Sequence, residues 1–330
     1  MMVGGSCIKM NKGKKGLREF VQNNLVLMTI LILVLVTVVL EPKFLSAANI
    51  GNIMNQFGPL SFVALGMTVA IIGGFIDLSV AGIVSFSAVF TISMIDVLGQ
   101  RMALAAGLSF GALLGLVNAL IIISCGAMTQ AKALFITYGL SAAYSALALL
   151  YTDGATQHMS YLESPVTVFK TIGSGKIGFI PFSFVIFLLV MLALHLFMSR
   201  TKTGREICLT GGNMSAASLS GIPIKRRVAL IFTLSGLLSA LGSIVLFSRI
   251  TTASPLLGAN YETNAILAVV VGGTSLSGGR GSMIRTMLGV MLVTLLSNCL
   301  NLLGVSTYLQ SVCKGMILII AIWLDRRRVK

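Results

Sequence analysis

The chain has 330 residues, of which 56% are apolar and only 10% are charged, and it contains 35 glycines. This balance is typical of a protein whose natural solvent is lipid, and it excludes a soluble globular protein. The formal net charge of +15 comes from basic residues in short clusters between apolar runs, which is the pattern of membrane-protein loops, so we expect no nucleic acid partner.

About ten apolar runs predict an all-α, polytopic membrane protein, because each approaches the roughly 20 residues that a transmembrane helix needs. In chain order the predicted spans are 25–40, 56–74, 79–98, 102–124, 133–151, 179–199, 228–248, 263–277, 283–304 and 305–324. No polar stretch between them is long enough to fold separately. Residues 25–324 are therefore predicted to form a single transmembrane domain.

The distribution of basic residues predicts the orientation of the chain. With the segment 1–24 and the tail 325–330 in the cytoplasm, most Lys and Arg residues fall on the cytoplasmic side, as the positive-inside rule requires. The basic residues left outside are Lys43, Arg101, Lys170, Lys176 and Arg249. In this orientation residues 152–178 and 249–262 form outer loops, and residues 200–227 form a long cytoplasmic loop.

The fourth predicted span contains three regularly spaced glycines. Gly107, Gly111 and Gly115 recur every four residues and so lie along one helix face, where they allow a neighbouring helix to approach closely. Asn118 continues close to this face. We expect a packing seam with Asn118 bonded across it, and the alternative is an asparagine that faces the solute.

Two charged residues lie beside or inside predicted spans, where a charge is costly and needs a reason. Asp77 lies near the start of the third span, where Asp77 or Ser79 could cap free N–H groups of the helix; a gating role is the alternative. Lys314 lies in the middle of the last span, too deep to reach water easily, so it should face protein or an aqueous pathway.

The eighth predicted span opens with Glu262 and Asn264 on the outer side and then reaches Gly272 and Gly273, which should break the helix. A broken helix at membrane depth is tolerated only where protein or an aqueous cavity satisfies its backbone. These glycines therefore indicate either a solute pathway or a tight buried turn. A similar pair, Gly73 and Gly74, follows an earlier apolar run and indicates a weak internal repeat.

Sequence motifs of enzymes are absent. The chain has no Walker A pattern, no G-x-S-x-G elbow, no H-E-x-x-H and no Cys/His cluster, and its five cysteines are scattered. We therefore expect no catalytic residues, no metal site and no cofactor bound by this chain.

The cytoplasmic loop contains the most patterned segment, TGREICLTGGNMSAASLSGI at residues 203–222. It resembles the signature of ribose-type ABC importer permeases, a sugar-transporting family. Further motifs follow in family order: FTLSGLLSAL at 232–241, VVGGTSLSGGRGS at 270–282 and NLLGV at 301–305, with ALGMT at 64–68, IDLS at 76–79 and GLVN at 115–118 before them. The resemblance covers nearly the whole chain.

This resemblance implies a permease subunit in a bacterial cell (inner) membrane that forms the pathway for a sugar or sugar-like solute. It also implies partners: ABC ATPase subunits that use ATP and Mg, an extracytoplasmic solute-binding protein, and a second permease copy or paralogue, all in membrane lipid. Residues 200–227 would then be an ATPase-coupling loop, with the residues Gly204, Arg205, Gly212, Asn213, Ala216, Ala217 and Gly221 in it. Asn213 could cap a short helix that Gly221 ends.

One departure from the family pattern concerns the outer side. Where that family has Glu-Leu-Asp-Ala-Ile, this chain has Glu262-Thr-Asn264-Ala-Ile, which removes a negative charge. The main alternative function is a secondary transporter driven by an ion gradient, with Asp77 and Lys314 as its coupling pair.

Overall fold

Helices make up nearly all of the regular structure. The computed structural model describes residues 25–329, with side chains described from 26 to 323. Its helices are α2 (Leu25–Leu40), η1 (Pro42–Leu45), α3 (Ala47–Ile72), α4 (Val80–Leu98), α5 (Gln100–Ser124), α6 (Gln130–Thr152), η2 (Met159–Tyr161), α7 (Thr167–Ser174), α8 (Phe182–Arg200), α9 (Lys202–Gly212), α10 (Met214–Leu219), α11 (Ile224–Ile250), α12 (Tyr261–Val271), α13 (Met283–Leu302) and α14 (Thr307–Val329).

Each predicted span coincides with one of these helices, so the prediction of an all-α membrane protein is confirmed. Within the described residues, α3, α4, α5, α6, α8, α11 and α13 are long and apolar enough to cross a membrane, and shorter apolar helices lie at 26–40, 261–271 and 307–323. Three boundaries were wrong, and the first is the start of the span at 56–74, since α3 begins at Ala47. The span at 263–277 ends at Val271, because Gly272 and Gly273 turn the chain, and the last helix continues through the predicted tail to Val329. The predicted segment 1–24 lies outside the described residues.

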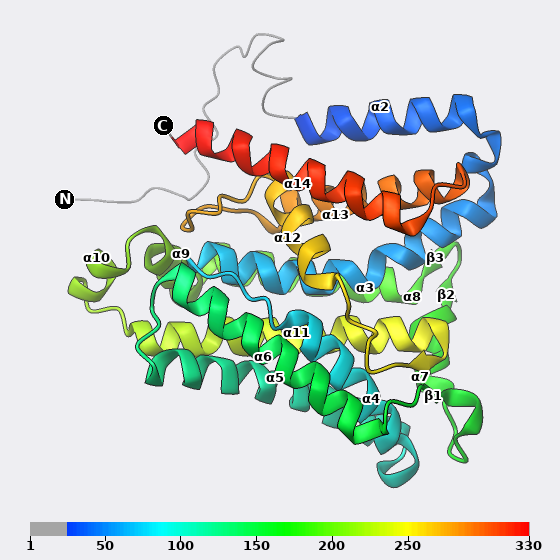
Figure 1. Cartoon of the computed structure of the whole chain (residues 1–330), viewed down its shortest axis with the longest axis horizontal. Coiled ribbons are helices and arrows are strands. Elements are labelled where there is room, and N and C mark those ends of the chain that lie inside the picture. The colour runs from blue at the N-terminus through cyan, green and yellow to red at the C-terminus, as the bar shows by residue number, and fades with distance from the viewer. Residues whose placement is uncertain (1–24, 330) are drawn as a thin grey trace.

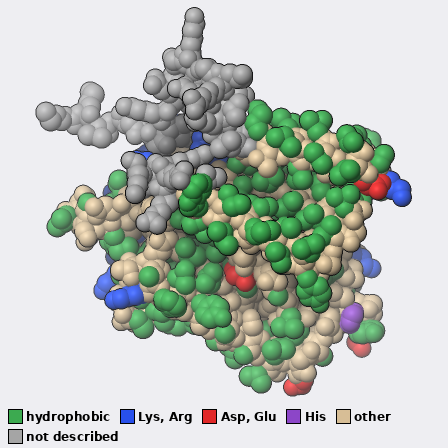
Figure 2. Space-filling model, turned by 45° about the horizontal axis from the view of Figure 1, so that its top comes forward, with side chains coloured by type: hydrophobic (Ala, Val, Ile, Leu, Met, Phe, Trp, Pro, Cys, Tyr) green, Lys and Arg blue, Asp and Glu red, His purple; other side chains and the backbone are tan. Residues whose placement is uncertain are grey.

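The long helices run alongside one another, with α3 and α11 in the centre (Figure 1). These two helices are mostly buried, whereas α6 and α8 expose most of their apolar side chains. Phe135 and Leu150 on α6, for example, are 73% and 75% exposed. Apolar side chains also cover much of the face seen in Figure 2. Such a large apolar surface is expected of a protein that is surrounded by lipid.

The loops separate into two ends of the molecule. Strand β1 (Gln157–His158) pairs antiparallel with β4 (Thr252–Ala253), which joins the two predicted outer loops to each other. A second small hairpin, β2 (Lys176–Ile177) with β3 (Ile180–Pro181), lies at the same end. Helix α10 and the C-terminal end of α14 lie at the opposite end (Figure 1).

The three glycines of α5 form the predicted packing seam. There is no room for a Cβ atom at any of them: at Gly107 it would meet the side chain of Thr91 on α4, and at Gly115 it would meet the backbone oxygen of Phe232 on α11. At Gly111 the obstacle is Ala240, also on α11. The seam therefore holds α5 against both α4 and α11, and the packing interpretation is confirmed.

Substituting Gly115 with valine should disrupt this seam. Forcing a side chain into a packed contact costs about 1–3 kcal/mol, so we expect Gly115→Val to lower the yield and the thermal stability of the detergent-solubilised protein. Gly139→Val is the matched control, because no atom lies within 4 Å of a Cβ at Gly139 on α6. Equal melting temperatures for the two variants in size-exclusion thermostability assays would contradict the seam.

Candidate functional site

The predicted coupling loop, residues 200–227, is folded into the two short helices α9 and α10 and the first residues of α11 rather than left irregular. Helix α9 begins at Thr201, whose hydroxyl oxygen accepts a hydrogen bond from the N–H of Gly204 at 3.0 Å. Helix α10 begins at Asn213, whose side-chain oxygen accepts from the N–H of Ala216 at 3.0 Å. Gly221, with a φ of +78°, ends α10. The predicted capped helix is therefore confirmed as a structural element.

The coupling-loop residues divide into exposed and buried groups. The exposed ones are Arg205, Gly212, Asn213, Ala216 and Gly221. Gly204 and Ala217 are buried within the chain, and a Cβ at Gly204 would meet the backbone of Met198 on α8. The apolar side chain of Leu219, at the end of α10, is 91% exposed. Helix α10 thus exposes an apolar side chain at its C-terminal end, on the side of the molecule that is predicted to be cytoplasmic.

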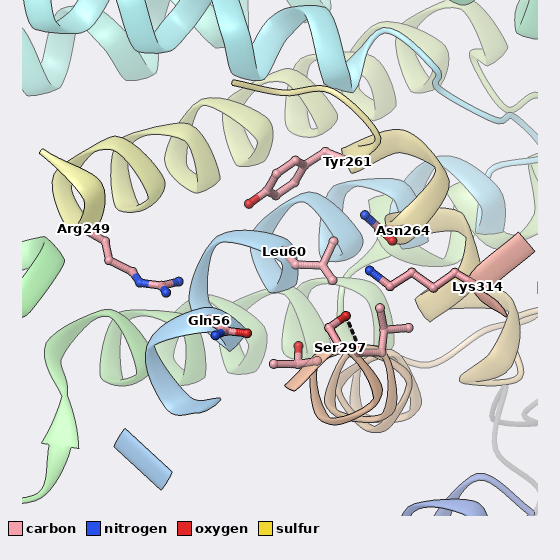
Figure 3. Close-up of a pocket in the computed structure, with 9 residues that line it drawn as sticks. Gln56, Leu60, Arg249, Tyr261, Asn264, Ser297 and Lys314 are labelled. Carbon is pink, nitrogen blue, oxygen red and sulfur yellow. Dashed lines mark hydrogen bonds between the residues drawn. The ribbon is translucent and has the colours of Figure 1, made fainter. Parts of the chain in front are cut away.

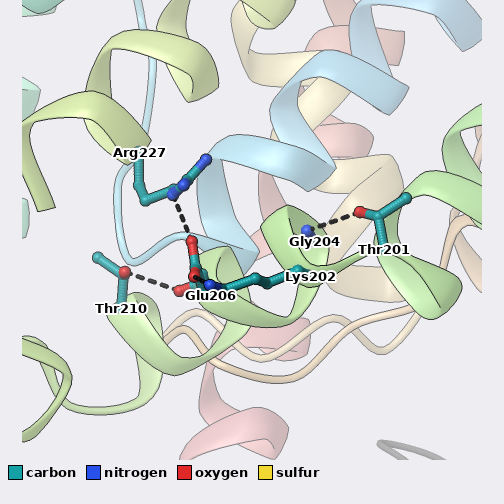
Figure 4. A network of polar contacts seen from close by, with 6 residues as sticks. All are labelled: Thr201, Lys202, Gly204, Glu206, Thr210 and Arg227. Carbon is teal, nitrogen blue, oxygen red and sulfur yellow. Dashed lines mark hydrogen bonds and ion pairs between the residues drawn. The ribbon is translucent and has the colours of Figure 1, made fainter. Parts of the chain in front are cut away.

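An ion pair that the sequence analysis missed joins α9 to the central helix α11. Arg227 Nε lies 2.6 Å from Glu206 Oε2, and Lys202 Nζ lies 3.9 Å from Glu206 Oε1 (Figure 4). The Arg227 and Glu206 side chains are 19% and 10% exposed. Removing either partner would leave a largely buried charge uncompensated, so the pair fixes α9 on α11.

Helices α3 and α12 end with the same turn, which gives the suspected repeat a structural basis. Gly74 and Gly273 have φ values of +87° and +88°. In each turn the next N–H reaches back into the helix: Phe75 N donates to Ala70 O at 2.9 Å, and Thr274 N donates to Val269 O at 3.2 Å. Only glycine adopts this conformation without strain. Of the two interpretations of Gly272 and Gly273, the structure therefore shows the tight turn.

The predicted coupling loop touches the end of α3 and the segment after α12 through glycines. A Cβ at Gly211 would meet the backbone of Ile72, Gly73 and Gly74 at the end of α3. Gly279, in the segment after α12, donates its N–H to Ile72 O at 2.8 Å. The sequence analysis selected Gly212, whose Cβ position has only the Gly279 Cα in reach at 3.9 Å. The doubled glycine was the available signal, but the sequence does not say which of the two makes the contact.

Asp77 is fully buried in the turn between α3 and α4 and is held by hydrogen bonds. Its Oδ1 accepts from the N–H of Ser79 at 3.1 Å and from the hydroxyl of Ser79 at 2.5 Å, and its Oδ2 accepts from the hydroxyl of Ser235 at 2.7 Å. Asp77 therefore satisfies an N–H at the start of α4, as the capping hypothesis expected. The Ser79 side chain forms no capping bond with α4.

Asn118 extends this group into a network that joins three helices to the turn before α4. It donates to the Ser79 hydroxyl at 2.6 Å and accepts from the Tyr144 hydroxyl at 2.7 Å. Tyr144 is on α6, Asn118 on α5 and Ser235 on α11, so the network links them to the turn before α4. Asn118 is fully buried, which favours a residue that is hydrogen-bonded across the seam over one that faces the solute. The sequence analysis missed Tyr144 and Ser235.

Two of the predicted pathway residues, Asn264 and Lys314, line one cavity of about 180 Å³ (Figure 3). Its walls come from α3, α11, α12, α13 and α14, and the lining residues are Gln56, Leu60, Arg249, Tyr261, Asn264, Val293, Thr294, Ser297 and Lys314. Asp77, Ser79 and Asn118 do not line it. Glu262 does not line it either, and its Oε2 is buried without a partner among the described residues.

The comparison with known proteins identifies the family. Residues 49–322 match the family described as branched-chain amino acid transport system / permease component. The chain belongs to this family.

The similarity to individual proteins extends over nearly the whole chain. The ribose import permease protein of Bacillus subtilis (strain 168) is 39% identical over 304 residues, which cover 90% of this chain and 90% of the relative. The ribose import permease protein of Escherichia coli (strain K12) is 32% identical, with 92% and 93% covered, and the galactose/methyl galactoside import permease protein of the same strain is 29% identical, with 94% and 96% covered.

A solved structure shares the fold. It is the structure of a metal-chelate type ABC transporter in an inward-facing conformation, with a TM-score of 0.50 and 16% identity, and the match covers 91% of this chain and 99% of that one. At this identity the likeness concerns the arrangement of helices alone.

Proposed function

We propose that this chain is the membrane-spanning permease subunit of an ATP-driven importer and forms the pathway for a sugar or sugar-like solute. The observation that carries the proposal is the exposed, capped helix α10 in a chain of this permease family, with Leu219 bare at its end. The identity with ribose import permeases supports a sugar as the solute. The sequence contains no ATP-hydrolysing motif, so ATP and Mg belong to a separate ATPase.

The complete importer would contain this chain in about ten spans of a bacterial inner membrane, with both termini in the cytoplasm. A second permease copy or paralogue would complete the pathway, ATPase subunits would dock on the coupling loops, and a solute-binding protein would deliver solute from outside. Helix α10 lies at one end of the molecule, and the predicted cytoplasmic segments, which include α10, carry most of the Lys and Arg residues. This distribution supports the orientation.

The contacts of the coupling loop suggest how ATPase closure reaches the solute. Helix α9 contacts the ends of α3 and the segment after α12 through Gly211 and Gly279. Helix α12 has 11 residues and so is about 16 Å long. Asn264, near its other end, lines the cavity. A displacement of α9 would therefore be transmitted by a short rigid helix to the cavity wall, as alternating access requires.

The ion-coupled alternative finds no support. Asp77 is bonded to serines in the turn before α4, whereas Lys314 lines the cavity, and the two form no ion pair in the described part of the chain. The named relatives are import permeases of ribose and of galactose.

Exchange of two exposed coupling-loop residues for glutamate should remove the ATPase. We expect an ATPase to co-purify with the detergent-solubilised wild type from its native membrane. It should be lost from the variant Arg205→Glu/Ala216→Glu, because docking would bury new negative charges without a partner. The control is Arg101→Glu/Ala155→Glu, which makes the same exchanges at exposed positions at the opposite end. Absence of an ATPase from a well-folded wild-type sample would overturn the proposed function.

A further inference from the structure

The cavity between α3, α11, α12, α13 and α14 contains two cations and no acid. Arg249 and Lys314 line it, while both ion pairs among the described residues belong to Glu206 at the other end of the molecule. Arg249 donates one hydrogen bond, to the backbone oxygen of Asn55 at 3.3 Å. Lys314 forms no hydrogen bond or ion pair with any described residue. The cavity therefore holds positive charge that the described part of the chain does not neutralise.

Neutral polar groups make up the rest of the polar lining. Asn264 lies next to the Lys314 ammonium group, whereas Gln56 and Arg249 lie on the other side of Leu60 in this view (Figure 3). The Ser297 hydroxyl donates to the backbone oxygen of Val293 at 2.9 Å and keeps its lone pairs free. Amide and hydroxyl groups of this kind hydrogen-bond the hydroxyls of a polyol, whereas an ammonium and a guanidinium group bind a carboxylate most strongly.

We infer that this cavity binds a solute that carries a carboxylate as well as hydroxyl groups, that is, a sugar acid of monosaccharide size. A volume of about 180 Å³ is below the roughly 300–1,000 Å³ of most small-molecule sites, which limits the solute to a small one. The carboxylate pairs with Lys314, and the hydroxyls next to it bond to Asn264. This inference rests on the proposed function and specifies its solute.

Two substitutions separate a charge requirement from a structural role of Lys314. Lys314→Gln removes the ammonium group. Asn264→Asp keeps the size of the side chain and gives Lys314 an acidic neighbour in the cavity, so it should neutralise the site and leave the fold intact. Lys314→Arg retains the charge. Lys132→Gln, an exposed lysine on α6 outside the cavity, is the control for loss of a positive charge alone.

The experiment measures ATP-dependent uptake by the complete importer in vesicles, with radiolabelled D-ribose, D-ribonate, D-galactose and D-galacturonate. We expect the wild type to take up a sugar acid in preference to its neutral partner. Lys314→Gln and Asn264→Asp should each lower that uptake at least about tenfold, because the first removes the charge-assisted contact to the carboxylate and the second neutralises Lys314 with an added acid. Lys314→Arg should lose less uptake than Lys314→Gln because it keeps the charge, Lys132→Gln should retain uptake, and the melting temperature of each variant reports its folding.

Uptake of neutral sugars with exclusion of both sugar acids, unchanged by Asn264→Asp and Lys314→Gln, would overturn the inference and leave the proposed function in place. If the wild type takes up none of the four solutes in the presence of ATP and a co-purifying ATPase, the inference falls together with a sugar as the solute. If no ATPase co-purifies, the proposed function itself fails.

Discussion

Gly211→Ala is expected to abolish ATP-dependent uptake, while Gly212→Ala remains close to the wild type. A Cβ at Gly211 would lie 2.7 Å from both Gly73 C and Gly74 N and closer still to Ile72 O, all of them backbone atoms that cannot rotate away. The end of α9 must then move off the end of α3, which separates the predicted coupling loop from the turn at Gly73 and Gly74. Because this junction is the direct contact between α9 and that turn, we expect at least a tenfold loss of uptake, equivalent to about 1.4 kcal/mol.

The neighbouring glycine makes this test specific. At Gly212 the nearest atom to a new Cβ is Gly279 Cα at 3.9 Å, an ordinary van der Waals distance. Both variants make the same chemical change in the last turn of the same helix. Uptake into vesicles and ATPase co-purification are measured for both. Retained ATPase with lost uptake in Gly211→Ala identifies a transmission defect, and equal uptake by the two variants would show that the glycine junction has no part in coupling.

Asp77→Ala should destabilise the permease by on the order of 3 kcal/mol or more. It leaves three buried donors without their acceptor, namely the N–H and hydroxyl of Ser79 and the hydroxyl of Ser235, and each unsatisfied buried group costs about 1–3 kcal/mol. The loss should spread to Asn118, which bonds to Ser79, and through it to Tyr144, which bonds to Asn118.

Thermal inactivation in detergent measures this effect, with Asp96→Ala as the control. Asp96 is on α4, the helix that follows the Asp77 turn, but it is exposed and accepts a single hydrogen bond, from Ser164 N at 2.9 Å. We expect the control to retain the wild-type melting temperature. A stable Asp77→Ala protein that fails only in uptake would contradict the structural role and favour a gating role for this carboxylate.

Local sequence signals were sufficient for the helices and for the caps of the coupling loop. An apolar run of span length predicts a membrane helix because its backbone must be satisfied internally in lipid. Asn213 and Gly221 bound α10 because capping depends on a few neighbouring residues. The glycine seam of α5 also follows from spacing alone, although its partner helices do not.

The departures at helix boundaries have a local cause as well. The eighth span was expected to continue to residue 277, but glycines at 272 and 273 allow the left-handed turn that ends α12 at Val271. Their spacing was visible in the sequence. The choice between a pathway and a tight turn depended on what surrounds them, because a Cβ at Gly272 meets the backbone of Arg285 on α13.

Thus the sequence by itself determined the class of protein, the helices, the capped helix α10 and the family resemblance, since these depend on residues close together or on motifs in order. Only the tertiary structure decided that Gly211 rather than Gly212 meets α3, that Asp77 bonds Ser235, and that Asn264 shares a cavity with Lys314. These pairings join segments far apart in the chain. They arise from the packing of helices, and the residue types on one helix do not identify the helix that packs against it.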